Sequence, residues 1–192
     1  CNSGAESVEA GIKVIRKFFH HNKEKKHKII CAKNSFHGRT FGAISASGKS
    51  SLTEGFDPIL DGFVQVEFNS TNEIIDNLDE NTAAIMIETV QGEGGITPAR
   101  KDYLRDLNKI AKEKNLLLFF DEVQCGVGRT GKFLAVEWVK ELKPNLVSIA
   151  KGIGGGFPVG ALLLDNKTTK SMEPGSHGST FGGNPLGMAV AN

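Results

Sequence analysis

The runs AAIMIE (residues 83–88) and LLLFFD (residues 116–121) decide the fold, together with the segment between them. That segment carries apolar residues at helical spacing, which are Tyr103, Leu104, Leu107, Ile110 and Ala111. The sequence therefore predicts strand, helix and strand in succession. Neither run alternates with polar residues, which is typical of strands that are covered on both faces. We predict an α/β fold in which a mainly parallel sheet carries helices on both faces.

Further elements are predicted on either side of this unit. Residues 3–6 (SGAE) have the Ser-x-x-Glu pattern of a capping box and lead into apolar residues at steps of three and four, Val8, Ile12, Ile15 and Phe19. Residues 70–73 repeat the capping pattern before a second short helix. Residues 29–32 and 146–150 are apolar runs that predict buried strands, and Pro185 is placed to open a last helix.

The composition argues against several classes of partner. Lys and Arg number 23 against 22 Asp and Glu, so the charge indicates neither nucleic acid nor a membrane surface as a partner. No apolar stretch has transmembrane length. The three cysteines are odd in number and form no zinc spacing with histidines, so we predict no disulfide framework and no metal site. Such cysteine usage predicts a reducing compartment, the cytoplasm.

Three predicted strands end in side chains that can carry chemistry. Glu88, Asp121 and Lys151 each stand at the carboxyl end of an apolar run. Open α/β sheets bind ligands along that edge, so we predict a site there. Lys151 precedes a glycine-rich stretch, residues 152–156, that leaves room for a planar ligand. A desolvated lysine in this place can form a Schiff base with an aldehyde, and the alternative is a surface lysine in a flexible loop.

Other residues fit an aldehyde cofactor, each with a plainer alternative. The first N–H groups of a helix starting at residues 3–5 favour a phosphate, although any capped helix start has this pattern. Asp121 could hold a protonated ring nitrogen, with Gln124 donating to a phenolic oxygen and Val123 packing on one ring face. The alternative is that Asp121 caps the next turn and that Glu122 is an ordinary exposed neighbour.

Two loops require separate interpretation. In residues 36–40 (FHGRT), Phe36 could stack on a cofactor ring and Arg39 could clamp a substrate carboxylate, unless Phe36 anchors the loop and Arg39 is solvated. Residues 42–50 (GAISASGKS) resemble the phosphate loop of nucleotide hydrolases but have five residues between the glycines, where that loop has four. No apolar strand leads into them, so we do not expect a nucleotide site.

Six blocks of sequence, in order, resemble the signature blocks of class III aminotransferases. They are SGAE (3–6), FHGRT (36–40), ETVQGEGG (88–95), DEVQCGVGRTG (121–131), AKG (150–152) and HGSTFGGNP (177–185). The resemblance spans the whole chain and implies the large domain of a fold-type I transferase with pyridoxal 5'-phosphate as cofactor. By this resemblance, residues 1–192 are an incomplete cofactor-binding large domain that lacks an N-terminal segment and the C-terminal small domain.

The resemblance implies a role for each of a set of residues. Those implied to contact the cofactor are Ser3, Gly4 and Ala5 at its phosphate, Phe36 and Val123 at its ring faces, Asp121 at its ring nitrogen, Gln124 at its phenolic oxygen and Lys151 as the catalytic Schiff-base lysine. Thr180 would reach the cofactor phosphate of a neighbouring subunit, which implies a homodimer with shared active sites. Arg39 would bind a substrate carboxylate, and Glu93 would pair with, and release, a second substrate arginine outside residues 1–192.

Within the family, residues 54–58 (EGFDP) and 156–160 (GFPVG) are most similar to bacterial acetylornithine aminotransferases. This implies transfer of the terminal amino group of N-acetylornithine to 2-oxoglutarate, giving N-acetylglutamate 5-semialdehyde and glutamate in arginine biosynthesis. The rival interpretations are another ω-aminotransferase, acting on ornithine, succinylornithine or 4-aminobutyrate, and a non-catalytic remnant. We expect little or no turnover from the 192-residue chain alone.

Two residues depart from the family pattern beside the predicted site. Thr89 stands where a proline usually follows the first glutamate, and Cys125 stands where a threonine usually follows the glutamine. Both substitutions are small, so we expect them to change fine geometry and to leave the chemistry intact.

Overall fold

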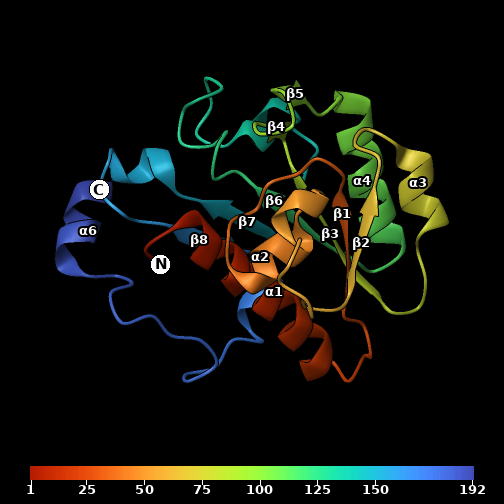
Figure 1. Ribbon diagram of the computed structural model, residues 1–192, viewed down its shortest axis with the longest axis horizontal. Coiled ribbons are helices and arrows are strands. Elements are labelled where there is room, and N and C mark those ends of the chain that lie inside the picture. The colour runs from red at the N-terminus through yellow and green to blue at the C-terminus, as the bar shows by residue number, and fades with distance from the viewer.

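A six-stranded sheet forms the centre of the computed structural model, which describes residues 1–192 (Figure 1). Its strands are β1 (Lys28–Ala32), β2 (Phe63–Val66), β3 (Thr82–Glu88), β6 (Leu117–Asp121), β7 (Leu146–Ile149) and β8 (Ala161–Leu164), and a separate antiparallel pair is formed by β4 (Val90–Gln91) and β5 (Thr97–Pro98). The α-helices are α1 (Gly4–His21), α2 (Phe41–Ala46), α3 (Thr71–Asp76), α4 (Lys101–Glu113), α5 (Asn166–Thr169) and α6 (Pro185–Ala191). Short 3-10 helices are η1 (Ser50–Leu52), η2 (Ala135–Trp138) and η3 (Lys151–Gly154).

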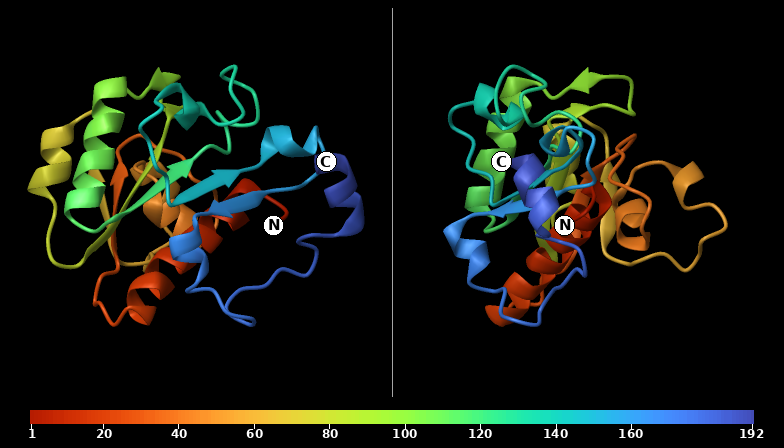
Figure 2. Two further views of the ribbon diagram at one scale, coloured as in Figure 1. Left: turned by 180° about the vertical axis from the view of Figure 1, so that it is seen from behind. Right: turned by 90° about the vertical axis from the view of Figure 1, so that its left-hand side faces the viewer.

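The sheet is mainly parallel, as the sequence predicts. Its order is β2-β1-β3-β6-β7-β8, and β8 alone runs antiparallel to its neighbour. Helices α1 and α2 pack on one face, where Ile29 and Phe119 point, and α3 and α4 pack on the other, where Ile30 and Phe120 point. Figure 2 shows the sheet between α4 and α2. Both faces are covered, which explains why the central strands are unbroken apolar runs.

The predicted helix starts are confirmed. Ser3 is extended and its Oγ accepts the N–H of Glu6 at 3.2 Å, so α1 begins at the next residue. Ser70 caps α3 in the same way through the N–H of Glu73, at 3.3 Å. Pro185 occupies the first position of α6. None of the helices combines the length and the apolar character needed to cross a bilayer.

The carboxyl ends of the three strands that are predicted to meet at one edge of the sheet do lie next to one another. Glu88 lies opposite Asp121 on the neighbouring strand, and Asp121 lies opposite Ser148. Lys151 follows the end of β7 by two residues and opens η3. The sheet therefore brings the ends of β3, β6 and β7 together at one edge.

The alternative interpretation of Asp121 takes Glu122 as an ordinary exposed neighbour, and this part of it is wrong. Glu122 is fully buried, and its carboxylate accepts the N–H groups of Ala135 at 2.6 Å and Val136 at 2.7 Å. These donors belong to the first turn of η2, where no partner within the helix is available. Burial raises the pKa of Glu122, and the two backbone donors act against that rise.

Candidate active site

A cavity of about 350 Å³ opens at the predicted edge. Its wall contains nine of the predicted site residues, namely Ser3, Gly4, Ala5, Phe36, Glu93, Asp121, Val123, Gln124 and Lys151. Arg39 and Thr180 do not line it, and both side chains are exposed. Ser3 and Lys151, which are 148 positions apart in the sequence, therefore share one cavity.

The first turn of α1 forms one part of the wall. Its N–H groups have no partner within the helix and are available to an anion. Close packing fixes this turn: a Cβ on Gly4 would lie 2.5 Å from Cγ1 of Val123, and one on Gly160 would lie 2.5 Å from the carbonyl oxygen of Ser3. Only glycine fits at these two positions, so the turn and Val123 approach each other closely.

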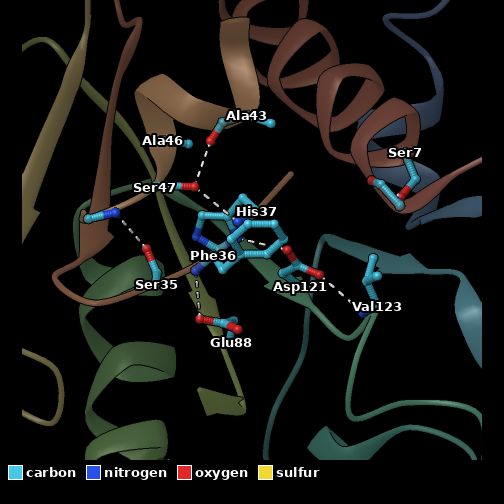
Figure 3. A network of polar contacts seen from close by, with 12 residues as sticks. Ser7, Ser35, Phe36, His37, Ala43, Ala46, Ser47, Glu88, Asp121 and Val123 are labelled. Carbon is cyan, nitrogen blue, oxygen red and sulfur yellow. Dashed lines mark hydrogen bonds and ion pairs between the residues drawn. The ribbon is translucent and has the colours of Figure 1, made fainter. Parts of the chain in front are cut away.

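The Asp121 carboxylate is held in a buried network (Figure 3). Its Oδ2 lies 2.7 Å from Nδ1 of His37, and its Oδ1 accepts the N–H of Val123 at 3.0 Å. The N–H of His37 in turn donates to Oγ of Ser47 at 3.0 Å, and that hydroxyl donates to the carbonyl oxygen of Ala43 at 2.8 Å. A chain of hydrogen bonds therefore connects Asp121, through His37 and Ser47, to α2.

His37 also lines the cavity, although the sequence block FHGRT predicts no role for it. Burial opposes its charge, but the hydrogen bond and the negative charge of Asp121, with a smaller contribution from Glu88, together raise the pKa of His37. Its Nε2 is buried and has no partner within the chain. We assign His37 as a positioning residue for Asp121, because it acts through that carboxylate.

Lys151 occupies an unusual backbone position. Its φ of 47° lies in the left-handed region, which strains any residue with a Cβ, and Gly155 and Gly156 after it also have positive φ. Its Nζ donates to Oε1 of Gln124. The side chain is exposed in the cavity, so the expectation of a desolvated lysine is wrong: the chain turns away from the sheet at Ala150 and lifts the amine clear of the core.

Phe36 and Glu88 connect the loop after β1 to the end of β3. The N–H of Phe36 donates to Oε2 of Glu88 at 3.3 Å, and the guanidinium carbon of Arg39 lies 5.5 Å from the centroid of the Phe36 ring. Glu88 is 4% exposed. Burial raises the pKa of Glu88 to about 7, with His37 acting against the rise and Asp121 adding to it.

Residues 42–50, which resemble a phosphate loop, contact the turn that contains Glu93. Nζ of Lys49 donates to the carbonyl oxygen of Glu93 at 2.8 Å. A Cβ on Gly48 would lie 2.4 Å from the carbonyl oxygen of Ala32, so this glycine permits close packing on the edge of β1. These contacts agree with our rejection of a nucleotide site.

The two departures from the family pattern touch each other. Oγ1 of Thr89 lies 2.9 Å from Sγ of Cys125, and both side chains are buried. Burial raises the pKa of Cys125 to about 11, so its thiol is neutral near pH 7. The pair links the residue after β3 to the turn after β6, directly behind the cavity.

The segment of Thr180 lies against the start of α1. Nδ2 of Asn2 donates to Oγ of Ser179 at 2.9 Å, and Nζ of Lys13 lies 3.0 Å from Nδ1 of His177. These bonds attach the segment to the chain while leaving Thr180 itself exposed.

The chain belongs to the class III aminotransferases, because its match to the family "Aminotransferase class-III" covers residues 1–192. It is 50% identical over 185 residues to the acetylornithine aminotransferase of Aquifex aeolicus, which is 96% of this chain and 49% of that relative. It is 48% identical over 192 residues to the acetylornithine aminotransferase of Clostridium acetobutylicum, which is 100% of this chain and 49% of that relative. The chain thus spans about half the length of the curated relatives it matches.

Solved structures lead to the same family. The ornithine aminotransferase of Toxoplasma gondii ME49 has a TM-score of 0.93 and 35% sequence identity, over 100% of this chain and 46% of that one. The parallel sheet described above is therefore the fold of aminotransferases that depend on pyridoxal phosphate.

Class III aminotransferases use pyridoxal phosphate, and the cavity meets three chemical requirements of that cofactor. The first turn of α1 offers N–H groups to a phosphate. Asp121 offers a buried carboxylate to a ring nitrogen, and Lys151 offers an exposed amine to an aldehyde. The cavity volume of about 350 Å³ lies within the roughly 300–1,000 Å³ of small-molecule sites.

Proposed function

We propose that residues 1–192 form the pyridoxal-phosphate-binding large domain of an acetylornithine-type aminotransferase. The proposed reaction moves the terminal amino group of N-acetylornithine to 2-oxoglutarate and gives N-acetylglutamate 5-semialdehyde and glutamate, as in arginine biosynthesis. The observation that carries the proposal is the shared cavity of Lys151, Asp121 and the first turn of α1. Identities of 50% and 48% to acetylornithine aminotransferases support the choice of substrate.

The proposed cofactor contacts follow from the chemistry of the wall. Ser3, Gly4 and Ala5 bind the phosphate through the free N–H groups of the helix start. Asp121 accepts a hydrogen bond from the ring nitrogen. Phe36 and Val123 pack on the ring faces, and Gln124 donates to the phenolic oxygen through its amide. When bound, pyridoxal phosphate supplies an aldehyde for the amino group and a ring that delocalises electrons released at the carbon carrying that group.

Lys151 is the proposed catalytic residue. Its amine would hold the cofactor's aldehyde in the absence of substrate and, once released, would remove the proton from the substrate carbon that carries the amino group. The contact with Gln124 orients Nζ toward the cavity. The strained backbone at this position is of a kind that clusters at functional sites.

Arg39 and Glu93 are the proposed substrate-binding residues. Arg39 lies beside Phe36 and presents an exposed guanidinium, which can bind a substrate carboxylate through two parallel hydrogen bonds. Glu93 lines the cavity and is the proposed partner of a second substrate arginine, held in place through the bond from Lys49 to its carbonyl oxygen.

We further propose a cytoplasmic homodimer in which Thr180 contacts the cofactor phosphate of the neighbouring subunit. Thr180 is exposed, and large apolar side chains are exposed beside it and along α6, namely Phe181, Leu186, Met188 and Val190. A cluster of this kind is typical of a surface that another chain covers. Three unpaired cysteines support the reducing compartment. We also propose that the 192-residue chain alone turns over little substrate, as the chain is about half as long as its relatives.

A second candidate is ornithine as amino donor, favoured by the TM-score of 0.93 to an ornithine aminotransferase. The deciding experiment mixes the cofactor-loaded protein with single amino donors and follows the absorbance change of one half-reaction. The proposal predicts the highest rate with N-acetylornithine. A higher rate with ornithine, succinylornithine or 4-aminobutyrate would replace it with that activity. One half-reaction needs a single conversion per site, so it is measurable in a chain that turns over little substrate. No change with any donor, in protein that binds the cofactor, would favour a non-catalytic remnant.

A further inference from the structure

Two carboxyl groups lie next to each other in the wall of the cavity. Glu88 is the last residue of β3 and pairs in register with Asp121, the last residue of β6. Neighbouring strands are about 4.8 Å apart, and both side chains point to the same face of the sheet. Each residue is 4% exposed, so little water is available to screen one carboxyl group from the other.

The two carboxyl groups have unequal partners. Asp121 has His37 at 2.7 Å and the N–H of Val123 at 3.0 Å, which use both of its oxygens. Glu88 accepts the N–H of Phe36 at 3.3 Å and, more weakly, the N–H of Gly92, but no cation is hydrogen-bonded to it. A buried carboxylate is stabilised by its hydrogen bonds and by opposite charge, so the pair favours the negative charge on Asp121 and a proton on Glu88.

Other charges near Glu88 do not change this preference for a negative charge on Asp121 and a proton on Glu88. His37, from the loop after β1, forms its ion pair with Asp121. Glu93, from the turn after β4, and Lys151, at the start of η3, line the same cavity but are exposed to solvent, which weakens their effect on a buried group. The pKa of Glu88 of about 7 agrees with a carboxyl group that is balanced between two charge states.

We propose that Glu88 is a charge-regulating positioning residue, which holds a proton while the cavity contains no ligand cation and releases it when a cationic ring nitrogen docks at Asp121. The proposal deepens the proposed function and rests on it for the identity of the cation. A docked cation stabilises both carboxylates, so binding and proton release favour each other by linkage. The released proton passes to solvent through the open cavity, and no other bond changes.

The resting state is tested first, without cofactor, by following glutamate side-chain carboxyl carbons by NMR in the purified protein from pH 4 to 9. One signal should titrate near pH 7 and be absent from the Glu88→Gln variant. Glu80→Gln, an exposed change, should leave that signal in place, and circular dichroism checks that each variant is folded. If no glutamate titrates above pH 6, the proposal is wrong.

The linkage is tested by adding pyridoxal phosphate. The Glu88 titration should move to lower pH by about one unit, and the ratio of dissociation constants, Glu88→Gln over unsubstituted protein, should rise about fivefold between pH 6 and pH 8. Taking a ratio cancels the titration of the cofactor itself. A constant ratio with normal binding overturns the Glu88 proposal alone. Failure of both proteins to bind overturns the proposed function, and the cofactor-free titration still decides the resting state.

Discussion

The two functional walls of the cavity are built in opposite ways. The wall of His37 and Asp121 is buried. The two side chains are bonded to each other, Ser47 accepts the backbone N–H of His37, and Val123 donates its N–H to Asp121. The wall of Lys151 is exposed, begins on a strained backbone and is followed by glycines. Under the proposed function this difference separates two tasks: the charge of Asp121, which is to be oriented before a ligand arrives, is fixed in the core, and the amine of Lys151, which is to change partners, is exposed.

The largest expected effect comes from breaking the buried wall. Asp121→Asn leaves the charge of His37 buried without its partner, so we expect the free energy of unfolding to fall by about 3 kcal/mol. Urea unfolding followed by circular dichroism measures this change. Asp102→Asn is the matched control, because its ion pair with Arg100 at 3.2 Å is exposed and should contribute little. Equal effects from both substitutions would contradict the fixed wall.

The free energy of unfolding should depend on pH through Glu88 and His37, which lie on this buried side of the cavity. Glu88 has a pKa of about 7 in the folded chain against an ordinary value of 4.5, so the folded state holds a proton that the unfolded state has released between these values. Stability therefore falls as pH rises through this window, by about 3 kcal/mol. His37, with its raised pKa, adds to the fall above pH 6.5.

Unfolding curves at pH 4.5 and pH 7.5 test this expectation for the unsubstituted chain and for Glu88→Gln. The variant should lose the part of the slope that lies below pH 7 and keep the part due to His37. Identical slopes in the two proteins would remove Glu88 from the account.

The contact between Thr89 and Cys125 lies behind the buried wall and should couple its two strands. A double-mutant cycle of Thr89→Val and Cys125→Ala should give an interaction energy of about 1 kcal/mol, because their side chains lie 2.9 Å apart. Thr89→Val combined with Cys31→Ala should be additive, since the buried thiol of Cys31 belongs to β1 and does not contact Thr89. Additivity in the first cycle would show that the two substitutions are independent.

The smallest effect is expected at the exposed wall. Lys151→Gly should raise the free energy of unfolding by about 1 kcal/mol or less, because glycine accepts a φ of 47° without a Cβ clash. Lys151→Ala keeps the Cβ and should change stability less. A loss of several kcal/mol from either variant would mean that Lys151 belongs to the core, against its exposure.

The sequence predicts which strand ends meet at the site, but it does not predict the hydrogen bonds between their side chains. The meeting of Glu88, Asp121 and Lys151 follows from apolar runs that must become parallel strands, whose carboxyl ends share an edge. The bond between His37 and Asp121 was beyond prediction, because 84 positions separate two residues that no local pattern connects.

The features that the sequence analysis missed or misjudged have a common physical origin. Glu122 is buried because η2, which begins 13 residues later, turns its unpaired N–H groups toward that carboxylate. Lys151 is exposed because the backbone leaves the sheet immediately before it. Edge strands β2 (FVQV) and β8 (ALLL) were not predicted, although their residues are mainly apolar; each run is only four residues long and is mostly half-buried. Tertiary partners that are distant in sequence decide all of these features.

The central claim is that Lys151 is the amine of an aldehyde-cofactor site whose charge is provided by Asp121. Its most direct test is titration of the purified protein with pyridoxal phosphate, followed by borohydride reduction and peptide mapping, with circular dichroism to verify folding. The account predicts a borohydride-sensitive absorbance band and a label on Lys151, both lost in Lys151→Ala. A folded protein with no such band, or a label that persists on other lysines in Lys151→Ala, would contradict it.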